Sequence, residues 1–166
     1  MKFDKIKSHA KINLSLNILG KFKSKLHKIE SLVSFLTLSD DIFIKKVKNK
    51  NHNVIFKGKF SKKIPKNNSI TNLLKILDEK KKLNNEKNLI LVKKNIPQRS
   101  GLGGGSMNAA SIIKYLLIKQ KINIKKNEVI KIISKIGSDV VLGMNQKNSA
   151  IYKNNKLKII NKNFRL

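Results

Sequence analysis

The chain has 166 residues, a formal net charge of +29 and no cysteine. This length suits a single hydrophobic core, so we expect one domain that spans residues 1–166. The lack of cysteine excludes a disulfide framework and a thiolate metal site, and no run approaches the roughly 18 apolar residues of a membrane-spanning helix. The composition therefore favours a cytoplasmic protein without a membrane partner.

The positive charge comes almost entirely from lysine, since arginine occurs only at Arg99 and Arg165. The lysines are scattered through every segment, among many asparagines and isoleucines, and are not gathered on one arm or helix. Aromatic residues, which stack on bases in nucleic-acid binders, make up only 5% of the chain. We interpret the charge as a background of exposed positions and expect no specific nucleic-acid partner. A basic RNA-binding module is the alternative.

The first third of the chain has the patterns of β-strands. Residues 11–18 (KINLSLNI) alternate strictly, which predicts a half-buried strand with one apolar face, made of Ile12, Leu14, Leu16 and Ile18. A second β region begins with SLVSFLTL (31–38), is predicted to turn at Asp40 and Asp41, and continues as IFIKKV. Another strand is expected at 53–56. This part of the chain is therefore predicted to be mostly sheet.

Helical spacing begins after Asn68, which we expect to cap an amphipathic helix. The apolar residues that recur at i, i+3, i+4 and i+7 are Ile70, Leu73, Leu74 and Leu77. A dense apolar strand at 88–92 follows and leads into a glycine-rich loop. After the loop, helical spacing resumes with Ala109, Ile112, Ile113, Leu116 and Leu117. This unit is predicted to be strand, loop and helix.

A third helix is predicted to start at Asn127 and to end at Gly137, a residue type that often ends helices. Its expected apolar stripe is Val129, Ile130, Ile132, Ile133 and Ile136. The chain then closes with two short strand patterns around Asn154 and Asn155, which predict a hairpin. With no internal repeat and no linker in the sequence, the whole chain is predicted to form one α+β unit.

The glycine loop predicts a binding site for an anion. Four glycines fall within positions 101–105, between a strand and a helix N-terminus, where backbone N–H groups are unpaired and the helix dipole is positive. A Cβ there would hold the backbone away from phosphate oxygens. The loop ends Gly105-Ser106-Met107, so it lacks the Gly-Lys-Ser/Thr of a P-loop. It also lacks the third glycine of a dinucleotide-binding motif, which has Ser106 in its place.

Three motifs, in order and spacing, resemble the GHMP kinases, a superfamily of small-molecule kinases. They are AKINLSLNILGK (10–21), the glycine loop with its following Asn-Ala-Ala, and GSDV (137–140). The resemblance covers essentially the whole chain. It implies the N-terminal domain of a GHMP kinase, an α+β fold of the ribosomal protein S5 domain 2-like type.

The motif forms are similar to those of family members that act on 4-(cytidine 5'-diphospho)-2-C-methyl-D-erythritol in the non-mevalonate isoprenoid pathway. The resemblance implies transfer of the γ-phosphoryl group of ATP, with Mg²⁺, to the 2-hydroxyl of this small-molecule substrate. Lys11 takes the place of the family's active-site lysine and Asp139 that of its catalytic aspartate. A carboxylate in hydrogen-bond reach can accept the hydroxyl proton, and an ammonium offsets charge on the transferring group. The alternatives are a GHMP kinase for another small alcohol and, for Asp139, a helix cap.

The remaining site residues follow from the same resemblance. Those expected to bind the nucleotide are Pro97, Gly101, Leu102, Gly103, Gly104, Gly105, Ser106, Asn68 and Lys94. Ser106 is also the candidate ligand for Mg²⁺ through its hydroxyl. Those expected to bind the phosphate acceptor are Asn13, His27 and Asn108.

The sequence departs from the family pattern in three places. The family's Asp-Gly-Tyr-His is Ser24-Lys25-Leu26-His27 here, so an aliphatic residue stands where an aromatic ring is expected beside cytosine. Met107 replaces a second serine of the loop. The family's C-terminal domain is absent from these 166 residues. Four interpretations fit the absence of this domain: a truncated product, a second domain on a separate chain, a domain with another role, and an inactive remnant.

Overall fold

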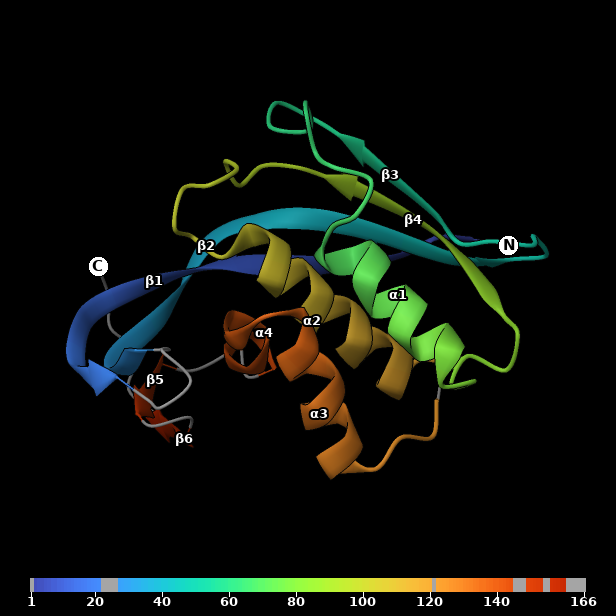
Figure 1. The fold of residues 1–166 in the computed structure, drawn as a ribbon. Coiled ribbons are helices and arrows are strands. Elements are labelled where there is room, and N and C mark those ends of the chain that lie inside the picture. Colours follow the sequence, from blue (N-terminus) through green and yellow to red (C-terminus); the bar gives the residue numbers. More distant parts are fainter. Residues whose placement is uncertain (1, 22–26, 121, 145–148, 154–155, 161–166) are drawn as a thin grey trace.

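The computed structural model describes residues 2–21, 27–120, 122–144, 149–153 and 156–160. Its strands are β1 (Asp4–Lys21), β2 (His27–Val47), β3 (Asn53–Lys57), β4 (Lys87–Lys93), β5 (Ser149–Lys153) and β6 (Lys156–Ile160). Its helices are α1 (Ser69–Glu79), α2 (Gly104–Ile118), α3 (Lys126–Ile136) and α4 (Ser138–Gly143). The helices gather on one side of the strands (Figure 1). This arrangement is the predicted α+β fold.

The sheet is mixed and is organised around β2, which has a partner on each edge. The strand order is β3-β4-β2-β5-β6, and β1 pairs with β2 along most of its length. On the other edge, β4 pairs with residues 41–47 of β2 and β5 with residues 30–33. Residues 34–40 of β2 lie between these two pairings, and this is where the chain leaving β4 turns into the glycine loop.

The core lies between the sheet and the helices. All four predicted apolar residues of α1 are buried there, and so are most of those of α2. Asn68 caps α1 as predicted: its side chain accepts hydrogen bonds from the N–H groups of Ile70 and Thr71, and Thr71 Oγ1 accepts one from the Asn68 N–H. These are the two arms of a capping box, so the helix start is set by local chemistry.

The predicted turn at Asp40 and Asp41 is wrong, because β2 continues through both residues without a break. An acidic pair in an apolar run predicts a turn when both carboxylates need water. Here Asp41 faces the outside of the sheet beside Lys5, while Asp40 is fully buried and takes its partners from other segments. Long-range pairing of Asp40 removes the need for a turn.

The predicted burial of the apolar face of residues 11–18 is wrong at its far end. Leu16 is 53% exposed and Ile18 is 67% exposed. This part of β1 extends beyond the helices (Figure 1), so none of them covers it. At the near end the buried residue is instead Lys11, whose side chain lies under the glycine loop.

The third helix ends at Gly137 as predicted, but Ile130 is 44% exposed and does not belong to the buried stripe. Val129, Ile132 and Ile133 share one face at helical spacing, and Ile130 lies about 100° away from Val129 around the helix axis. The closing hairpin is confirmed by the antiparallel pairing of β5 with β6, and its turn at Asn154 and Asn155 lies outside the described residues. None of the helices in the described part of the chain is long and apolar enough to cross a membrane.

Candidate active site

The glycine loop joins β4 to α2 and leaves the start of α2 without a side-chain cap. Gly103 is the N-cap residue, with φ 69° and ψ 14°, and no side chain accepts a hydrogen bond from the first turn. Gly101 also has a left-handed φ, of 76°. The first N–H groups of a helix are unpaired unless a cap or a ligand satisfies them, and the helix dipole favours an anion there. The loop therefore has the backbone geometry of a phosphate site.

Two of the glycines leave room that any side chain would fill. A Cβ on Gly104 would lie 3.1 Å from Ile96 Cγ2 and 3.2 Å from Lys94 Nζ. A Cβ on Gly103 would lie 2.9 Å from Lys11 Cγ. Bare backbone is needed at both positions, because the loop passes directly over two lysine side chains. These lysines bring positive charge under the loop, which suits a bound phosphate chain.

Lys11 and Asp139, predicted to form the catalytic pair, are brought together by the fold. Lys11 Nζ lies 3.3 Å from Asp139 Oδ2 and 3.2 Å from Asn13 Oδ1. The backbone N–H of Lys11 donates to the carbonyl of Leu102 over 3.0 Å. β1 is thereby tied to the loop at the residue that carries the ammonium, and Asn13 lies beside it as the alternation predicted.

Asp139 lies in the first turn of α4 and does not cap this helix. The N-cap is Gly137, and no side-chain hydrogen bond is made there. The alternative interpretation of Asp139 as a cap is therefore wrong. Its side chain is 37% exposed, whereas that of Lys11 is 6% exposed, so the carboxylate faces outward from a buried ammonium. This orientation leaves the carboxylate open to a substrate hydroxyl.

A cavity of about 320 Å³ lies over the loop. It is lined by every residue predicted to bind the nucleotide except Leu102, and by Asn108. Leu102 takes part through its carbonyl, which holds Lys11. The prediction missed Phe56 and Ile64 in the lining, since β3 and the segment after it have no motif that marks them as site residues. It also missed Arg99, which lies between β4 and the loop glycines.

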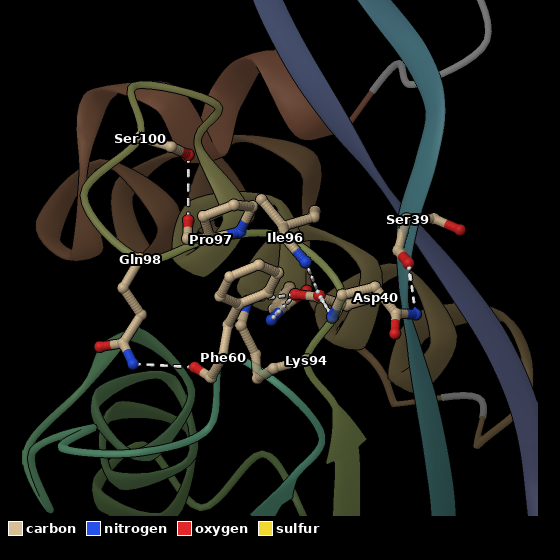
Figure 2. A network of polar contacts seen from close by, with 10 residues as sticks. Ser39, Asp40, Phe60, Lys94, Ile96, Pro97, Gln98 and Ser100 are labelled. Carbon is tan, nitrogen blue, oxygen red and sulfur yellow. Dashed lines mark hydrogen bonds and ion pairs between the residues drawn. The ribbon is translucent and has the colours of Figure 1, made fainter.

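The floor of the cavity contains a buried polar network that the sequence did not reveal (Figure 2). Lys94 Nζ donates to the Asp40 carboxylate, and Asn108 Nδ2 donates to Asp40 Oδ2 over 2.9 Å. Asn108, predicted to bind the acceptor, is 1% exposed, so its amide serves Asp40. Its contact with substrate stays a prediction.

The outer side of the loop is held by a different set of contacts (Figure 2). Gln98 Nε2 donates to the carbonyls of Phe60 and Lys62, over 2.8 and 2.6 Å. Ser100 Oγ donates to the carbonyl of Pro97. The loop is thus attached to the segment after β3 as well as to β1 and β2, which restricts how far it can move.

Comparison with known proteins places these features in one family. A family model described as the GHMP kinases N terminal domain matches residues 68–151, from the cap of α1 to β5. The chain belongs to the GHMP kinase family. The matched region contains the glycine loop, Asn108 and Asp139, whereas Lys11 precedes it. The predicted fold class, the N-terminal domain of a GHMP kinase, is confirmed.

Two curated relatives of this GHMP kinase chain carry the same name. The 4-diphosphocytidyl-2-C-methyl-D-erythritol kinase of Pelagibacter ubique is 54% identical over 154 residues, which are 93% of this chain and 54% of that protein. The protein of the same name from Thermosipho melanesiensis is 37% identical over 135 residues, or 81% of this chain and 46% of that protein. The chain therefore spans about half the length of the curated relatives it matches.

Solved structures show the same fold. A crystal structure of 4-(cytidine 5'-diphospho)-2C-methyl-D-erythritol kinase matches with a TM-score of 0.73 at 21% identity, over 95% of this chain and 55% of that one. Lactococcus lactis galactokinase in complex with galactose matches with a TM-score of 0.65 at 14% identity, over 98% of this chain and 48% of that one. Two kinases named for different substrates thus share this architecture.

One departure from the family pattern, Met107, is located by the structure. Met107 is buried in a small cluster with Val33 and Leu142, so it fills space beneath the loop and does not line the cavity. Ser106 does line the cavity, and its Oγ lies 3.7 Å from the position of a Cβ on Gly137, beside α4. His27 is the first residue of β2, opposite Lys21, while Leu26 lies outside the described residues.

Proposed function

We propose that the chain is the nucleotide-binding half of a 4-diphosphocytidyl-2-C-methyl-D-erythritol kinase. The reaction would transfer the γ-phosphoryl group of ATP to the 2-hydroxyl of the cytidyl-diphosphate methylerythritol, in the cytoplasm. The observation that carries the proposal is the 3.3 Å contact between Lys11 Nζ and Asp139 Oδ2 beside the glycine loop. The relatives that share this sequence at 54% and 37% identity support the choice of substrate.

The residues of the chain have distinct roles in this reaction. The N–H groups at the start of α2 and the Lys94 ammonium hold the phosphates. Bare backbone at Gly103 and Gly104 lets the loop pass close over the Lys11 and Lys94 side chains. The hydroxyl of Ser106 would ligate Mg²⁺, which would enter with the nucleotide and offset phosphate charge. Such positioning supplies most of the catalysis in phosphoryl transfer.

The proton of the attacking hydroxyl goes to Asp139. The carboxylate is partly exposed beside the loop, and a general base in this position contributes about 10²- to 10⁴-fold in rate. Lys11 stabilises the negative charge of that carboxylate and of the transferring group, because its buried ammonium lies against both the loop and Asp139. Asn13 fixes Lys11 through its 3.2 Å contact.

The experiment is calorimetric titration of the 166-residue chain with Mg·ATP, with a Gly104→Asp variant as control. A Cβ at position 104 would lie 3.2 Å from Lys94 Nζ and 3.1 Å from Ile96 Cγ2, so the added carboxylate would offset the Lys94 charge and displace the start of α2. We expect Mg·ATP binding by the wild-type chain and none by the variant. Transfer from γ-labelled ATP to the cytidyl substrate, with galactose and RNA as competitors, then tests the substrate. Absence of Mg·ATP binding by the wild-type chain would contradict the proposal. RNA binding that ATP does not displace would favour the RNA-binding alternative.

A further inference from the structure

Asp40 has an environment that a structural aspartate seldom has. It is 0% exposed, in the middle of the apolar strand β2, and each of its oxygens accepts two hydrogen bonds. Oδ1 accepts from the backbone N–H groups of Asn95, over 2.7 Å, and Ile96, over 2.9 Å. Oδ2 accepts from Lys94 Nζ and Asn108 Nδ2. The carboxylate is therefore fully satisfied without water.

These four donors come from the two ends of the glycine loop. Lys94, Asn95 and Ile96 follow β4 and lead into the loop, and Asn108 lies in the first turns of α2, just after it. Pairing of β4 with β2 ends where Lys93 lies opposite Asp41. The Lys94 N–H still donates to the carbonyl of Lys57 in β3, over 2.7 Å. The N–H groups of Asn95 and Ile96 then bond to the Asp40 side chain in place of a strand backbone, so Asp40 helps to determine where the loop begins (Figure 2).

Asp40 also determines where the Lys94 ammonium lies. Lys94 is 4% exposed, lines the cavity, and has its Nζ 3.2 Å from the position of a Cβ on Gly104. An ammonium carries three donors, and among the described residues Asp40 is the acceptor for one of them. The Asp40 contact therefore holds the ammonium close to Gly104, at the start of α2. Removal of one partner of a buried ion pair is strongly destabilising, so the placement of this charge has to be tested apart from folding.

We propose that Asp40 is a positioning residue for nucleotide phosphate, which clamps both ends of the glycine loop and holds Lys94 beneath it. This inference rests on the proposed nucleotide site. The Asp40 carboxylate sets the distance between residues 95–96, before the loop, and Asn108, after it. It also sets the position of the buried Lys94 ammonium. Removal of its charge should therefore weaken the binding of phosphate groups and leave the binding of the nucleoside unchanged.

The test compares Mg·ATP with adenosine, which has no phosphates, in calorimetric titrations of the 166-residue chain and its variants. Asp40→Asn keeps an acceptor for the two backbone N–H groups but turns an amide N–H₂ toward Lys94 and Asn108. We expect Mg·ATP affinity to fall about tenfold or more and adenosine affinity to stay the same. Asp41→Asn is the matched control on the opposite face of β2, where Asp41 pairs with exposed Lys5, and should change neither affinity.

Two further variants separate positioning from folding. Asn108→Leu removes only the helix-side contact and should weaken Mg·ATP binding less than Asp40→Asn does. The exchange Asp40→Asn/Asn108→Asp returns one carboxylate to the same cluster and should recover part of the Mg·ATP affinity. If Asp40→Asn does not fold, the Mg·ATP affinities of these two variants test the positioning role in its place.

The outcomes distinguish this inference from the proposed function. Equal Mg·ATP affinity in wild type and in each folded variant would overturn the role of Asp40 alone. A parallel loss for Mg·ATP and adenosine would also overturn it, because that is the result of a general structural defect. No Mg·ATP binding by the wild-type chain would overturn the nucleotide site and the positioning role together.

Discussion

Lys11 Nζ and Asp139 Oδ2 lie 3.3 Å apart, although one belongs to β1 and the other to the first turn of α4. α2 brings them together, since it packs on β1 at one side and on α4 at the other (Figure 1). The glycine loop at the start of α2 also receives the Lys11 N–H, through the Leu102 carbonyl. The proposed catalytic pair and the glycine loop are thus held together through α2 and β1.

The first prediction concerns this pair. Asp139→Asn should lower phosphoryl transfer about 10²- to 10⁴-fold, because an amide cannot accept the hydroxyl proton, and should leave Mg·ATP affinity nearly unchanged. Single-turnover transfer from γ-labelled ATP and calorimetry measure the two effects. The control is Lys7→Met, which changes an exposed lysine of β1, the strand that also contains Lys11. Unchanged transfer in Asp139→Asn would remove this carboxylate from the mechanism.

The second prediction compares two glycines of the loop. Gly101 and Gly103 both have left-handed φ, so alanine costs about 1–2 kcal/mol at either position. Only at Gly103 would the new Cβ meet a side chain, 2.9 Å from Lys11 Cγ; at Gly101 nothing lies within 4 Å. We expect both variants to lose stability in urea unfolding and Gly103→Ala to lose phosphoryl transfer as well. Equal transfer by the two variants would show that the loop tolerates a displaced Lys11.

The third prediction concerns the contact that places α4. A Cβ on Gly143 would lie 2.5 Å from the Cβ of Ala110 on α2, closer than real Cβ atoms approach. Gly143→Ala should destabilise the fold by about 1–3 kcal/mol and move Asp139 away from Lys11. The double variant Ala110→Gly/Gly143→Ala restores the space and should recover transfer, although glycine in α2 keeps a cost in stability. Urea unfolding and transfer assays of both variants measure this, and no recovery in the double variant would contradict it.

The local signals in the sequence predicted the parts of the fold that depend on neighbouring residues. The stripe and cap of α1 and the strand, loop and helix around Gly103 follow from spacing and turn chemistry, and all were confirmed. Lys11 and Asp139 needed motif resemblance, because a single lysine in so basic a chain carries no signal of its own.

The parts that were missed depend on long-range partners. A turn was predicted at Asp40 because its neighbours in sequence do not show the four hydrogen-bond donors around its carboxylate. All four donors come from segments more than 50 residues away. Exposure of Leu16 and Ile18 depends on how far the helices reach along β1, and alternation cannot give this length. Both errors come from tertiary context that overrides a local pattern.

The fourth prediction concerns the cap of α1, which also lines the cavity. Asn68→Ala removes the acceptor for the N–H groups of Ile70 and Thr71 and should cost about 1 kcal/mol of stability. Asn67→Ala is the matched control, since Asn67 is exposed and next in sequence, and its effect should stay within about 0.5 kcal/mol. Urea unfolding of both variants gives the difference. Equal stability of the two would mean that the capping box adds nothing.

His52 gives the fold a dependence on pH that lies apart from the glycine loop. Its Nδ1 accepts the backbone N–H of Asn88 over 2.9 Å, and its Nε2 lies 3.2 Å from Asp78 Oδ2. Burial lowers the pKa of His52 below 6.5, and nearby Lys87 acts in the same direction, while Asp78 opposes them. Protonation of Nδ1 would also break the hydrogen bond from Asn88.

The fifth prediction follows from the sign of this shift. Because the pKa of His52 is lowered on folding, the unfolded chain binds the proton first as the pH falls. We expect the contribution of His52 to be fully present above pH 6.5 and to be lost as the pH falls through its lower folded pKa, with a slope of at most about 1.4 kcal/mol per pH unit. His52→Asn keeps an acceptor for the Asn88 N–H and does not titrate, so the free energy of unfolding should vary less between pH 7.5 and about pH 5.5. Urea unfolding at several pH values measures both proteins, and identical slopes would show that His52 does not titrate differently in the folded chain.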